Sequence, residues 1–347
     1  MAGWPDKLRL AHLPTPLQRA AALDALVGCE LWIKRDDMTG GAEAGNKIRK
    51  LEYLLAAARA QGADSVITCG GVQSNHARAT AILARQLGLR PVLMLRTADG
   101  RAPALPWQGN LMLGGLLGAE LHFITPAQYR ERDRLLADLA AELRGGGRVP
   151  YVIPEGGSCG LGALGYVDAM AEVRGQLDGG VRERGEPAPP SRFDAAVHAC
   201  GSGGTAAGIC IGAALHDVAD QAVAVAVCDD GAYFSERVRS IHAELETFLP
   251  ELVRSQVPLR ILDDYKGPAY GVASPEQSAF IAEVARVSGL ILDPVYSGKA
   301  LFGLARLAPK AARVLFVHTG GLPGLLAEPE QFSAQMPLPT FPTLRSS

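Results

Sequence analysis

Residues 194–213 read DAAVHACGSGGTAAGICIGA. An apolar run of strand length, 194–199, leads through the glycine-rich turn Cys200-Gly-Ser-Gly-Gly-Thr205 into a helical segment of small residues. A strand that passes into a helix through glycines is typical of open α/β sheets. The exposed N–H groups of such a turn and the positive end of the helix attract anions, so the turn indicates a phosphate site. A tight turn without a ligand is the alternative interpretation.

The turn differs from two kinds of nucleotide-binding loop. It lacks the lysine of the G-x-x-x-x-G-K-[ST] loop that binds nucleoside triphosphates. Ala206 occupies the position of the last glycine in the G-x-G-x-x-G dinucleotide pattern, which tolerates alanine only in part. Asp229 and Asp230 lie roughly 20 residues further on, where a dinucleotide site carries its acidic residue. An NAD-dependent oxidoreductase is therefore an alternative from a different class, although it leaves the lysine and serine motifs described below unexplained.

Strand-length apolar runs alternate with helical-period segments along most of the chain. We expect further strands at 31–34, 65–68, 91–95, 121–124, 151–153, 222–227 and 314–318. We expect helices at 46–61, 74–87, 126–144 and 205–215. This alternation predicts an α/β fold with two open, twisted, mostly parallel sheets flanked by helices. Proline and glycine content also predicts a surface loop at 179–191 and an extended arm after residue 328.

The overall composition narrows the class of protein. At about 150 residues per domain, a chain of 347 residues suggests two domains. The 34 basic and 36 acidic residues give a net charge of -2, so charge gives no reason to expect nucleic acid or a membrane surface as partner. No apolar run approaches the ~20 residues that span a bilayer. The 6 cysteines are scattered without a C-x-x-C pair, so we expect a cytoplasmic protein without a metal or a disulfide framework.

Two further junctions carry polar side chains that suit a small anionic ligand. Lys47 and Lys50 lie three residues apart near the start of a predicted helix, so they share one face. Cations at a helix N-terminus oppose the macrodipole, which favours a functional role over the alternative of a solvated basic turn. Before the next predicted helix, Ser74 or Asn75 can cap the helix while its first N–H groups bind a carboxylate. His76, taken alone, is more typical of a structural histidine than of a general base.

The order and spacing of these motifs resemble a known family. The chain resembles the pyridoxal-phosphate enzymes of the tryptophan-synthase-β fold type (fold type II), in the group that holds D-cysteine desulfhydrase and 1-aminocyclopropane-1-carboxylate deaminase. The matching stretches include Leu13-Pro-Thr-Pro-Leu17, Ile33-Lys-Arg-Asp-Asp37, Gly45-Asn-Lys-Ile-Arg-Lys-Leu-Glu-Tyr53, Gln73-Ser-Asn-His76, Tyr151-Val-Ile-Pro-Glu-Gly-Gly-Ser158, Gly201-Ser-Gly-Gly-Thr205, Tyr270-Gly-Val272, Leu292-Asp-Pro-Val-Tyr296 and His318-Thr-Gly-Gly321.

The resemblance implies a role for each motif. Lys47 matches the lysine that forms a Schiff base with pyridoxal phosphate, and Asn75 matches the residue bonded to the cofactor 3′-oxygen. Ser74, with the backbone of Asn75 and His76, matches the substrate-carboxylate site. The remaining matches are Tyr270 and Tyr296 for two active-site tyrosines, Lys50, Gly201, Ser202, Gly203, Gly204 and Thr205 for the phosphate, and Ser297 and Thr319 for partners of the ring nitrogen.

The resemblance also implies the organisation of the protein. A large cofactor-binding domain would comprise 1–52 and 165–347, and a small domain 53–164, with the cofactor between them. A small amino acid would be the substrate, and the protein would form a homodimer.

Two positions distinguish the activities within the family. The deaminases carry a glutamate at the position of Ser297 and a leucine at the position of Thr319. A hydroxyl keeps the ring nitrogen less protonated than a carboxylate does, so it gives a weaker electron sink. Loss of a good β leaving group needs a weaker electron sink than opening of a cyclopropane ring does. The hypothesis is therefore α,β-elimination from D-cysteine or a related β-substituted alanine, giving pyruvate, ammonia and hydrogen sulfide.

Within that hypothesis some roles stay open. Lys47 or Ser74 would take the α-proton, and Tyr270 and Tyr296 would protonate or orient the departing sulfur. L-cysteate sulfo-lyase, which expels sulfite, is an alternative that needs extra donors for a sulfonate. Candidate donors are Arg78, Arg96 and Arg101, each of which would otherwise be an ordinary surface arginine. 1-Aminocyclopropane-1-carboxylate deaminase, amino-acid racemisation and a cofactor-free binding protein are further alternatives.

Overall fold

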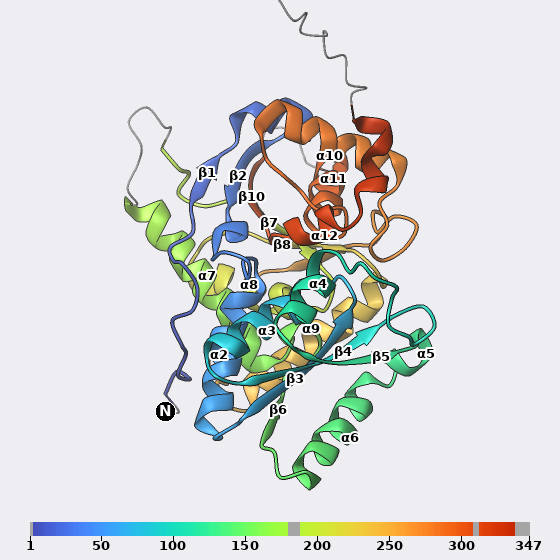
Figure 1. Ribbon diagram of the computed structural model, residues 1–347. Helices are drawn as coiled ribbons and strands as arrows, with labels where there is room; N and C mark the ends of the chain where they lie inside the picture. The colour runs from blue at the N-terminus through green and yellow to red at the C-terminus, as the bar shows by residue number, and fades with distance from the viewer. Residues whose placement is uncertain (1–2, 180–187, 308–311, 337–347) are drawn as a thin grey trace, which may run out of the picture.

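The computed structural model describes residues 3–179, 188–307 and 312–336. Within them, the strands form two sheets, which lie in the upper and lower halves of the molecule in Figure 1. The larger sheet has the order β1-β2-β10-β7-β8-β9, and each neighbouring pair is parallel except β1 and β2. Its strands are β1 (Leu17–Arg19), β2 (Glu30–Lys34), β7 (Ala195–Cys200), β8 (Ala222–Ala226), β9 (Leu259–Leu262) and β10 (Arg313–Val317).

The smaller sheet has the order β5-β4-β3-β6 and is parallel throughout. Its strands are β3 (Ser65–Gly71), β4 (Arg90–Arg96), β5 (Glu120–Ile124) and β6 (Pro150–Val152). These strands fall within 65–152, inside the segment 53–164 expected for a small domain. The boundaries of the domains themselves stay a prediction.

The two sheets confirm the predicted fold class, and burial explains why the sequence revealed it. β7 and β8 are buried along their whole length, as expected for parallel strands covered by helices on both faces. Each predicted strand is present in the structure. The sequence patterns did not reveal β1 and β9, which are the edge strands of the larger sheet. Both are short and partly exposed, so their apolar signal is weak.

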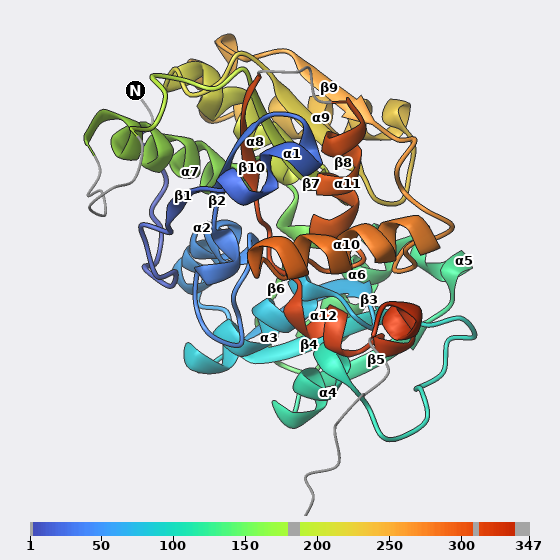
Figure 2. The same cartoon turned by 90° about the horizontal axis from the view of Figure 1, so that it is seen from above.

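Helices cover the sheets, as the view from above in Figure 2 shows. In the described part of the chain they are α1 (Asp24–Val27), α2 (Lys47–Ala60), α3 (Asn75–Gln86), α4 (Gly109–Leu116), α5 (Pro126–Tyr129), α6 (Arg132–Gly145), α7 (Gly160–Gly179), α8 (Gly204–Leu215), α9 (Gly231–Glu246), α10 (Pro275–Ser288), α11 (Ser297–Leu307) and α12 (Leu322–Leu326). α2, α3 and α8 confirm three predicted helices. The single helix expected at 126–144 is two helices in the structure. Arg130 is the C-cap of α5, and Glu131 is the N-cap of α6.

Two glycines on α8 allow it to lie close against α7. A Cβ atom on Gly212 would be 2.8 Å from the Cβ of Met170. A Cβ atom on Gly208 would collide with the carbonyl oxygen of Ala163. This close packing brings the start of α8, and with it the glycine-rich turn, against the segment that precedes α7.

Two expectations concern segments near the edges of the described residues. The loop predicted at 179–191 is described only in part, since 180–187 lie outside the described residues, as do 337–347. The extended arm expected after residue 328 is wrong for Pro329–Gln335, which forms a short 3₁₀ helix. Its Phe332 is buried in the core of the larger sheet, and this apolar contact holds the segment in place. Among the helices of the described residues, none combines the length and apolarity needed to cross a membrane.

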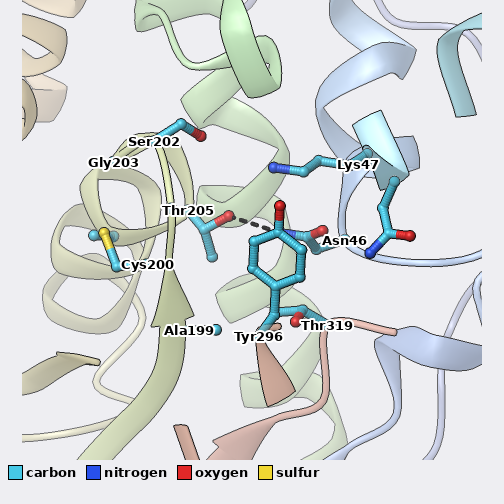
Figure 3. A pocket seen from close by; sticks show the side chains of 12 residues that line it. Asn46, Lys47, Ala199, Cys200, Ser202, Gly203, Thr205, Tyr296 and Thr319 are labelled. Atoms are coloured by element: carbon cyan, nitrogen blue, oxygen red, sulfur yellow. Dashed lines mark hydrogen bonds between the residues drawn. The ribbon is translucent and has the colours of Figure 1, made fainter. Parts of the chain in front are cut away.

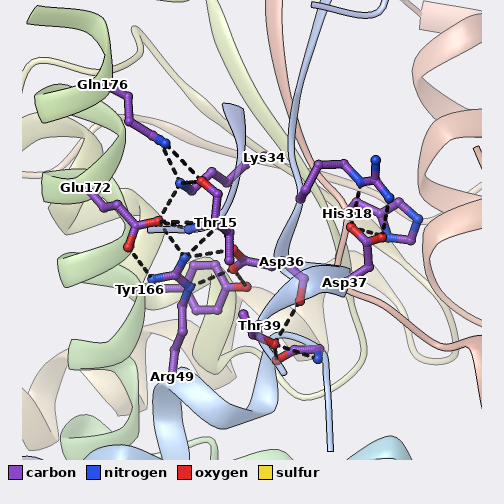
Figure 4. Close-up of polar contacts among 12 residues, drawn as sticks. Thr15, Lys34, Asp36, Asp37, Thr39, Arg49, Tyr166, Glu172, Gln176 and His318 are labelled. Carbon is purple, nitrogen blue, oxygen red and sulfur yellow. Dashed lines mark hydrogen bonds and ion pairs between the residues drawn. The ribbon is translucent and has the colours of Figure 1, made fainter. Parts of the chain in front are cut away.

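A buried network of ion pairs fixes α2 to the larger sheet and to α7 (Figure 4). Arg49 of α2 pairs with Asp36, which follows β2, at 2.8 Å, and with Glu172 of α7 at 3.0 Å. Lys34 of β2 pairs with Glu172 at 2.5 Å, and the Tyr166 hydroxyl donates to Asp36 at 2.7 Å. Because each charge has a partner, the network can be buried without an uncompensated ion. It determines where the start of α2 lies.

We expect Arg49→Met to lower the free energy of unfolding by about 3–5 kcal/mol, because it leaves Asp36 and part of Glu172 buried without a counterion. Arg59→Met, on an exposed position near the end of the same helix, should change it by about 0.5 kcal/mol at most. Urea unfolding of the two variants and the wild type measures both values. A loss in Arg49→Met no larger than in the control contradicts the anchoring role.

Candidate active site

Two neighbouring cavities lie at the carboxyl ends of strands from both sheets, where ligands bind in open α/β folds. The first is narrow, and the second is wider and more open to solvent. They share Lys47, Gly201, Ser202 and Tyr296, so Lys47 lies where the two meet.

Lys47 is the first residue of α2, and its side chain reaches toward the glycine-rich turn (Figure 3). Its amine makes one long contact, 3.5 Å to the carbonyl oxygen of Gly156. Burial lowers the pKa of Lys47 to about 8, and the nearby Glu155 carboxylate limits the fall. About a tenth of such an amine is neutral at pH 7. The neutral form is the nucleophile that a bond to an aldehyde requires.

Lys50 lies behind the cavity wall with its amine against the start of α8. Its Nζ donates to Ser158 Oγ at 3.2 Å, and Ser158 Oγ accepts the Gly204 N–H at 3.1 Å. A Cβ atom on Gly204 would be 2.8 Å from Lys50 Nζ, so the amine fits there because residue 204 is glycine. Burial and the charge of Lys47 lower the pKa of Lys50 well below its usual value. No carboxylate in the described residues pairs with Lys50, so its buried positive charge suits an anion such as phosphate.

The start of α3 offers backbone donors to the larger cavity. Ser74 is the N-cap, and its hydroxyl oxygen accepts the Ala77 N–H at 3.2 Å. Asn75 and His76 follow as the first helical residues, whose N–H groups have no partner inside a helix. Such a helix start suits a carboxylate. The substrate-carboxylate role of Ser74 and its neighbours stays a prediction.

The Asn75 side chain is held in one orientation by its neighbours. Its Oδ1 accepts from Asn110 Nδ2 at 3.0 Å and from Arg78 Nη1 at 3.3 Å. With the oxygen used in this way, the amide N–H groups are left to face the first cavity, which Asn75 lines. Arg78 is buried and also donates to the Ala44 carbonyl at 2.5 Å. Its guanidinium lines neither cavity, so it is not the sulfonate donor considered from the sequence.

His76 is a structural histidine. The Thr68 hydroxyl donates to the Ile153 carbonyl at 2.8 Å, so it accepts from His76 Nε2 at 2.9 Å. Burial, together with the charges of Lys47 and Lys50, lowers the pKa of His76 well below its usual value. The ring is therefore neutral, and its contribution to a ligand site comes from its backbone N–H.

Two tyrosines complete the larger cavity. The hydroxyls of Tyr270 and Tyr296 share a hydrogen bond of 2.5 Å, and their rings meet edge to face. Burial raises the pKa of Tyr270 to about 12 and that of Tyr296 well above its usual value. Both hydroxyls therefore carry their protons at neutral pH and can act as donors.

The two expected partners of a ring nitrogen are in different places. Thr319, which follows β10, lines the first cavity. Its role as a partner of the ring nitrogen stays a prediction. Ser297 does not line this cavity, because its hydroxyl donates to Asp293 Oδ1 at 2.6 Å and the residue is fully buried. Asp293 also accepts the Ser297 N–H at 2.7 Å, which fixes the serine at the start of α11. Contrary to the expectation, Ser297 therefore does not face the site.

Most of the residues chosen from the sequence come together in the structure. Those that line a cavity are Lys47, Ser74, Asn75, His76, Gly201, Ser202, Gly203, Thr205, Tyr270, Tyr296 and Thr319. Lys50 and Gly204 contact the wall from behind. The sequence reasoning did not select Asn46, whose amide donates to Thr205 Oγ1 at 3.1 Å, nor Ser158 and Glu155. The sequence did contain a signal for them, because Asn46 directly precedes Lys47 and the other two follow the predicted strand 151–153.

Comparison with known proteins agrees with this geometry. The family model for pyridoxal-phosphate dependent enzymes matches residues 8–320. A bifunctional D-cysteine desulfhydrase/1-aminocyclopropane-1-carboxylate deaminase from Arabidopsis thaliana is 42% identical, covering 94% of this chain and 81% of the relative. A D-cysteine desulfhydrase from Yersinia enterocolitica is 38% identical, covering 92% and 95%. The crystal structure of an ACC deaminase homologue has a TM-score of 0.83 and 35% identity, covering 96% and 97%.

The chain belongs to the family of pyridoxal-phosphate dependent enzymes. The residues at the first cavity fit this cofactor, because they provide what it requires chemically. Lys47 offers an amine of lowered pKa for the aldehyde, and Lys50 with the turn 201–205 offers a buried site for the phosphate. The free amide of Asn75 is suited to a ring oxygen.

We expect borohydride treatment of the cofactor-loaded protein to fix the cofactor mass on Lys47, as located by peptide mass spectrometry. Lys47→Ala should remove that labelled peptide. Lys50→Ala should keep it while weakening cofactor binding about 10–150-fold, because a hydrogen bond to a charged group contributes roughly 1.5–3 kcal/mol. Titration of the cofactor-free variants measures the second effect. Label on Lys50 in the wild type contradicts the assignment.

Proposed function

We propose that the enzyme is a carbon–sulfur lyase that converts D-cysteine, or a closely related β-substituted alanine, to pyruvate, ammonia and hydrogen sulfide. The observation that carries the proposal is a base and a pair of acids on one cavity: the Lys47 amine and the hydroxyls of Tyr270 and Tyr296. Elimination needs both, because one group must take the α-proton while another supplies a proton to the leaving sulfur. Relatives at 42% and 38% identity whose names include D-cysteine desulfhydrase support it.

Each residue then has a defined task. When bound, pyridoxal phosphate withdraws electrons from the substrate Cα and makes its proton acidic. Lys47 takes that proton in preference to Ser74, because an amine with a pKa of about 8 is a far better base than a hydroxyl. The electron pair of the Cα–H bond forms the Cα–Cβ double bond, and the Cβ–S bond breaks with its pair on sulfur. Tyr270 or Tyr296 protonates that sulfur, while the N–H groups at the start of α3 hold the carboxylate.

The lining of the first cavity favours elimination over opening of a cyclopropane ring. Within the described residues, neither aspartate nor glutamate lines this cavity, and Thr319 contributes a hydroxyl there. A ring nitrogen without a carboxylate partner is the weaker electron sink, which suffices for a thiolate leaving group. Of the two hydroxyl residues expected at the ring nitrogen, Thr319 lines this cavity and Ser297 faces Asp293 instead. 1-Aminocyclopropane-1-carboxylate remains the alternative substrate because the Arabidopsis relative carries both names.

L-cysteate is a second candidate substrate, favoured by one arginine. Arg96 lines the larger cavity, whereas Arg101 lies exposed in the loop beyond β4 and lines neither cavity. A guanidinium in this position can accompany a sulfonate. In that case sulfite leaves instead of sulfide.

The remaining expectations concern the setting of the reaction. We also propose a homodimer that takes a small amino acid, as the family resemblance implies. The net charge and the scattered cysteines support a cytoplasmic protein without nucleic acid or membrane as partner. Light scattering of the purified protein measures whether it is a homodimer.

The substrate is tested by measuring product release from D-cysteine, L-cysteine, L-cysteate, D-serine and 1-aminocyclopropane-1-carboxylate side by side. We expect pyruvate from D-cysteine at the highest kcat/KM, because thiolate is a good leaving group, and no 2-oxobutyrate from the cyclopropane. Pyruvate from L-cysteate alone moves the assignment to the sulfo-lyase. Release of 2-oxobutyrate shows that the argument from Thr319 is wrong.

A further inference from the structure

Arg96 is a charged residue of the larger cavity that the proposed reaction leaves without a task. It is the last residue of β4 and lies in register with Gly71, the last residue of β3. This position, at the carboxyl edge of the smaller sheet, places it on the same cavity as Lys47 and Ser74. Its guanidinium lies over the ring of Tyr270, which lines the same cavity.

The guanidinium of Arg96 is stacked between two aromatic rings. Its central carbon is 4.9 Å from the centre of the Tyr129 ring and 5.3 Å from the centre of the Tyr270 ring. Both distances are within the roughly 6 Å at which a cation is attracted to the face of an aromatic ring. Tyr270 in turn shares its hydroxyl hydrogen bond with Tyr296. Arg96 therefore contacts the proton-donor pair through the ring of Tyr270.

Arg96 forms no ion pair within the described residues, although carboxylates line the same cavity. Arg132 also lies over the Tyr129 ring, at 5.3 Å, but it pairs with Glu155 at 3.0 Å. Glu155 accepts the Tyr129 hydroxyl as well, at 2.5 Å. Across the three described segments, Arg96 has no ion pair and no side-chain hydrogen bond. Its charge therefore acts on the two rings that it lies over, those of Tyr129 and Tyr270.

We propose that Arg96 is a positioning residue that orients Tyr270 and makes the Tyr270–Tyr296 pair a stronger proton donor to the departing sulfur. The inference rests on the proposed elimination. When a tyrosine hydroxyl gives its proton to sulfur, a phenolate forms in a buried site, and a cation beside the ring stabilises that charge. Burial raises the pKa of Tyr270 to about 12, and Arg96 opposes this rise. The group acts through Tyr270 and needs no contact with substrate.

The test uses two leaving groups of different basicity. Sulfur leaves D-cysteine with help from a proton, whereas chloride leaves β-chloro-D-alanine without one. A general acid contributes about 10²–10⁴-fold, and losing one supporting charge should remove about tenfold of it. We therefore expect Arg96→Gln to lower kcat for D-cysteine about tenfold and to leave kcat for β-chloro-D-alanine nearly unchanged. Arg96→Lys, which keeps the charge but not the planar stack, should restore part of the loss.

A double-mutant cycle locates the route of the effect. Tyr270→Phe should show the same preference for loss with D-cysteine, and adding Arg96→Gln to it should cost nothing more, because Arg96 acts through the missing hydroxyl. Arg101→Gln removes an exposed arginine just beyond the same strand and should match the wild type with both substrates. Thermal unfolding of each variant reports on stability separately.

The outcomes separate the two proposals. Equal losses for both substrates, or fully additive losses in the cycle, assign Arg96 a purely structural role and overturn the inference while the lyase assignment stands. Unchanged kcat in Arg96→Gln with D-cysteine overturns it too. A wild-type enzyme that releases pyruvate from neither substrate overturns the lyase proposal, and the inference falls with it.

Discussion

Neutralisation of the buried Arg49 is the constraint on which the site depends. Lys47, Arg49 and Lys50 bring three cations to the first turn of α2, where the helix dipole disfavours positive charge. Arg49 points away from the cavity and finds Asp36 and Glu172, so its burial anchors the helix. The helical period then turns Lys47 and Lys50 to the opposite side, toward the carboxyl ends of the strands. The position of both lysines thus follows from an ion-pair network whose residues line neither cavity.

Neither Lys47 nor Lys50 forms an ion pair within the described residues, which indicates a functional role for both. Burial lowers the pKa of Lys47, and burial together with the charge of Lys47 lowers that of Lys50. This state is unfavourable for stability but suits a protein that binds an anionic cofactor. Such local conflicts with stability are expected at functional sites. Pyridoxal phosphate brings the charge that the cavity lacks, and the close packing of α8 on α7 puts the glycine-rich turn where the phosphate is needed.

How far the sequence predicted the structure depended on how local each signal was. Buried strands such as β7, and the turn 201–205 after it, have signals confined to a few adjacent residues, and both were predicted correctly. The edge strands β1 and β9 have little apolar pattern because one side of each is unpaired and exposed. Ser297 was misplaced because its adjacent residues match a site motif, whereas the hydrogen bond to Asp293 turns its hydroxyl away.

The sequence by itself determined the alternation of strands and helices, the glycine turn and the lysines, because each is encoded by residue type within one turn or strand. Only the tertiary structure decided which charges are paired. Arg78 and Arg96 look alike in sequence, yet one is buried against Ala44 and Asn110 while the other lies over Tyr129 and Tyr270. Partners of this kind come from segments tens or hundreds of residues away, and burial removes the water that would otherwise make such differences small.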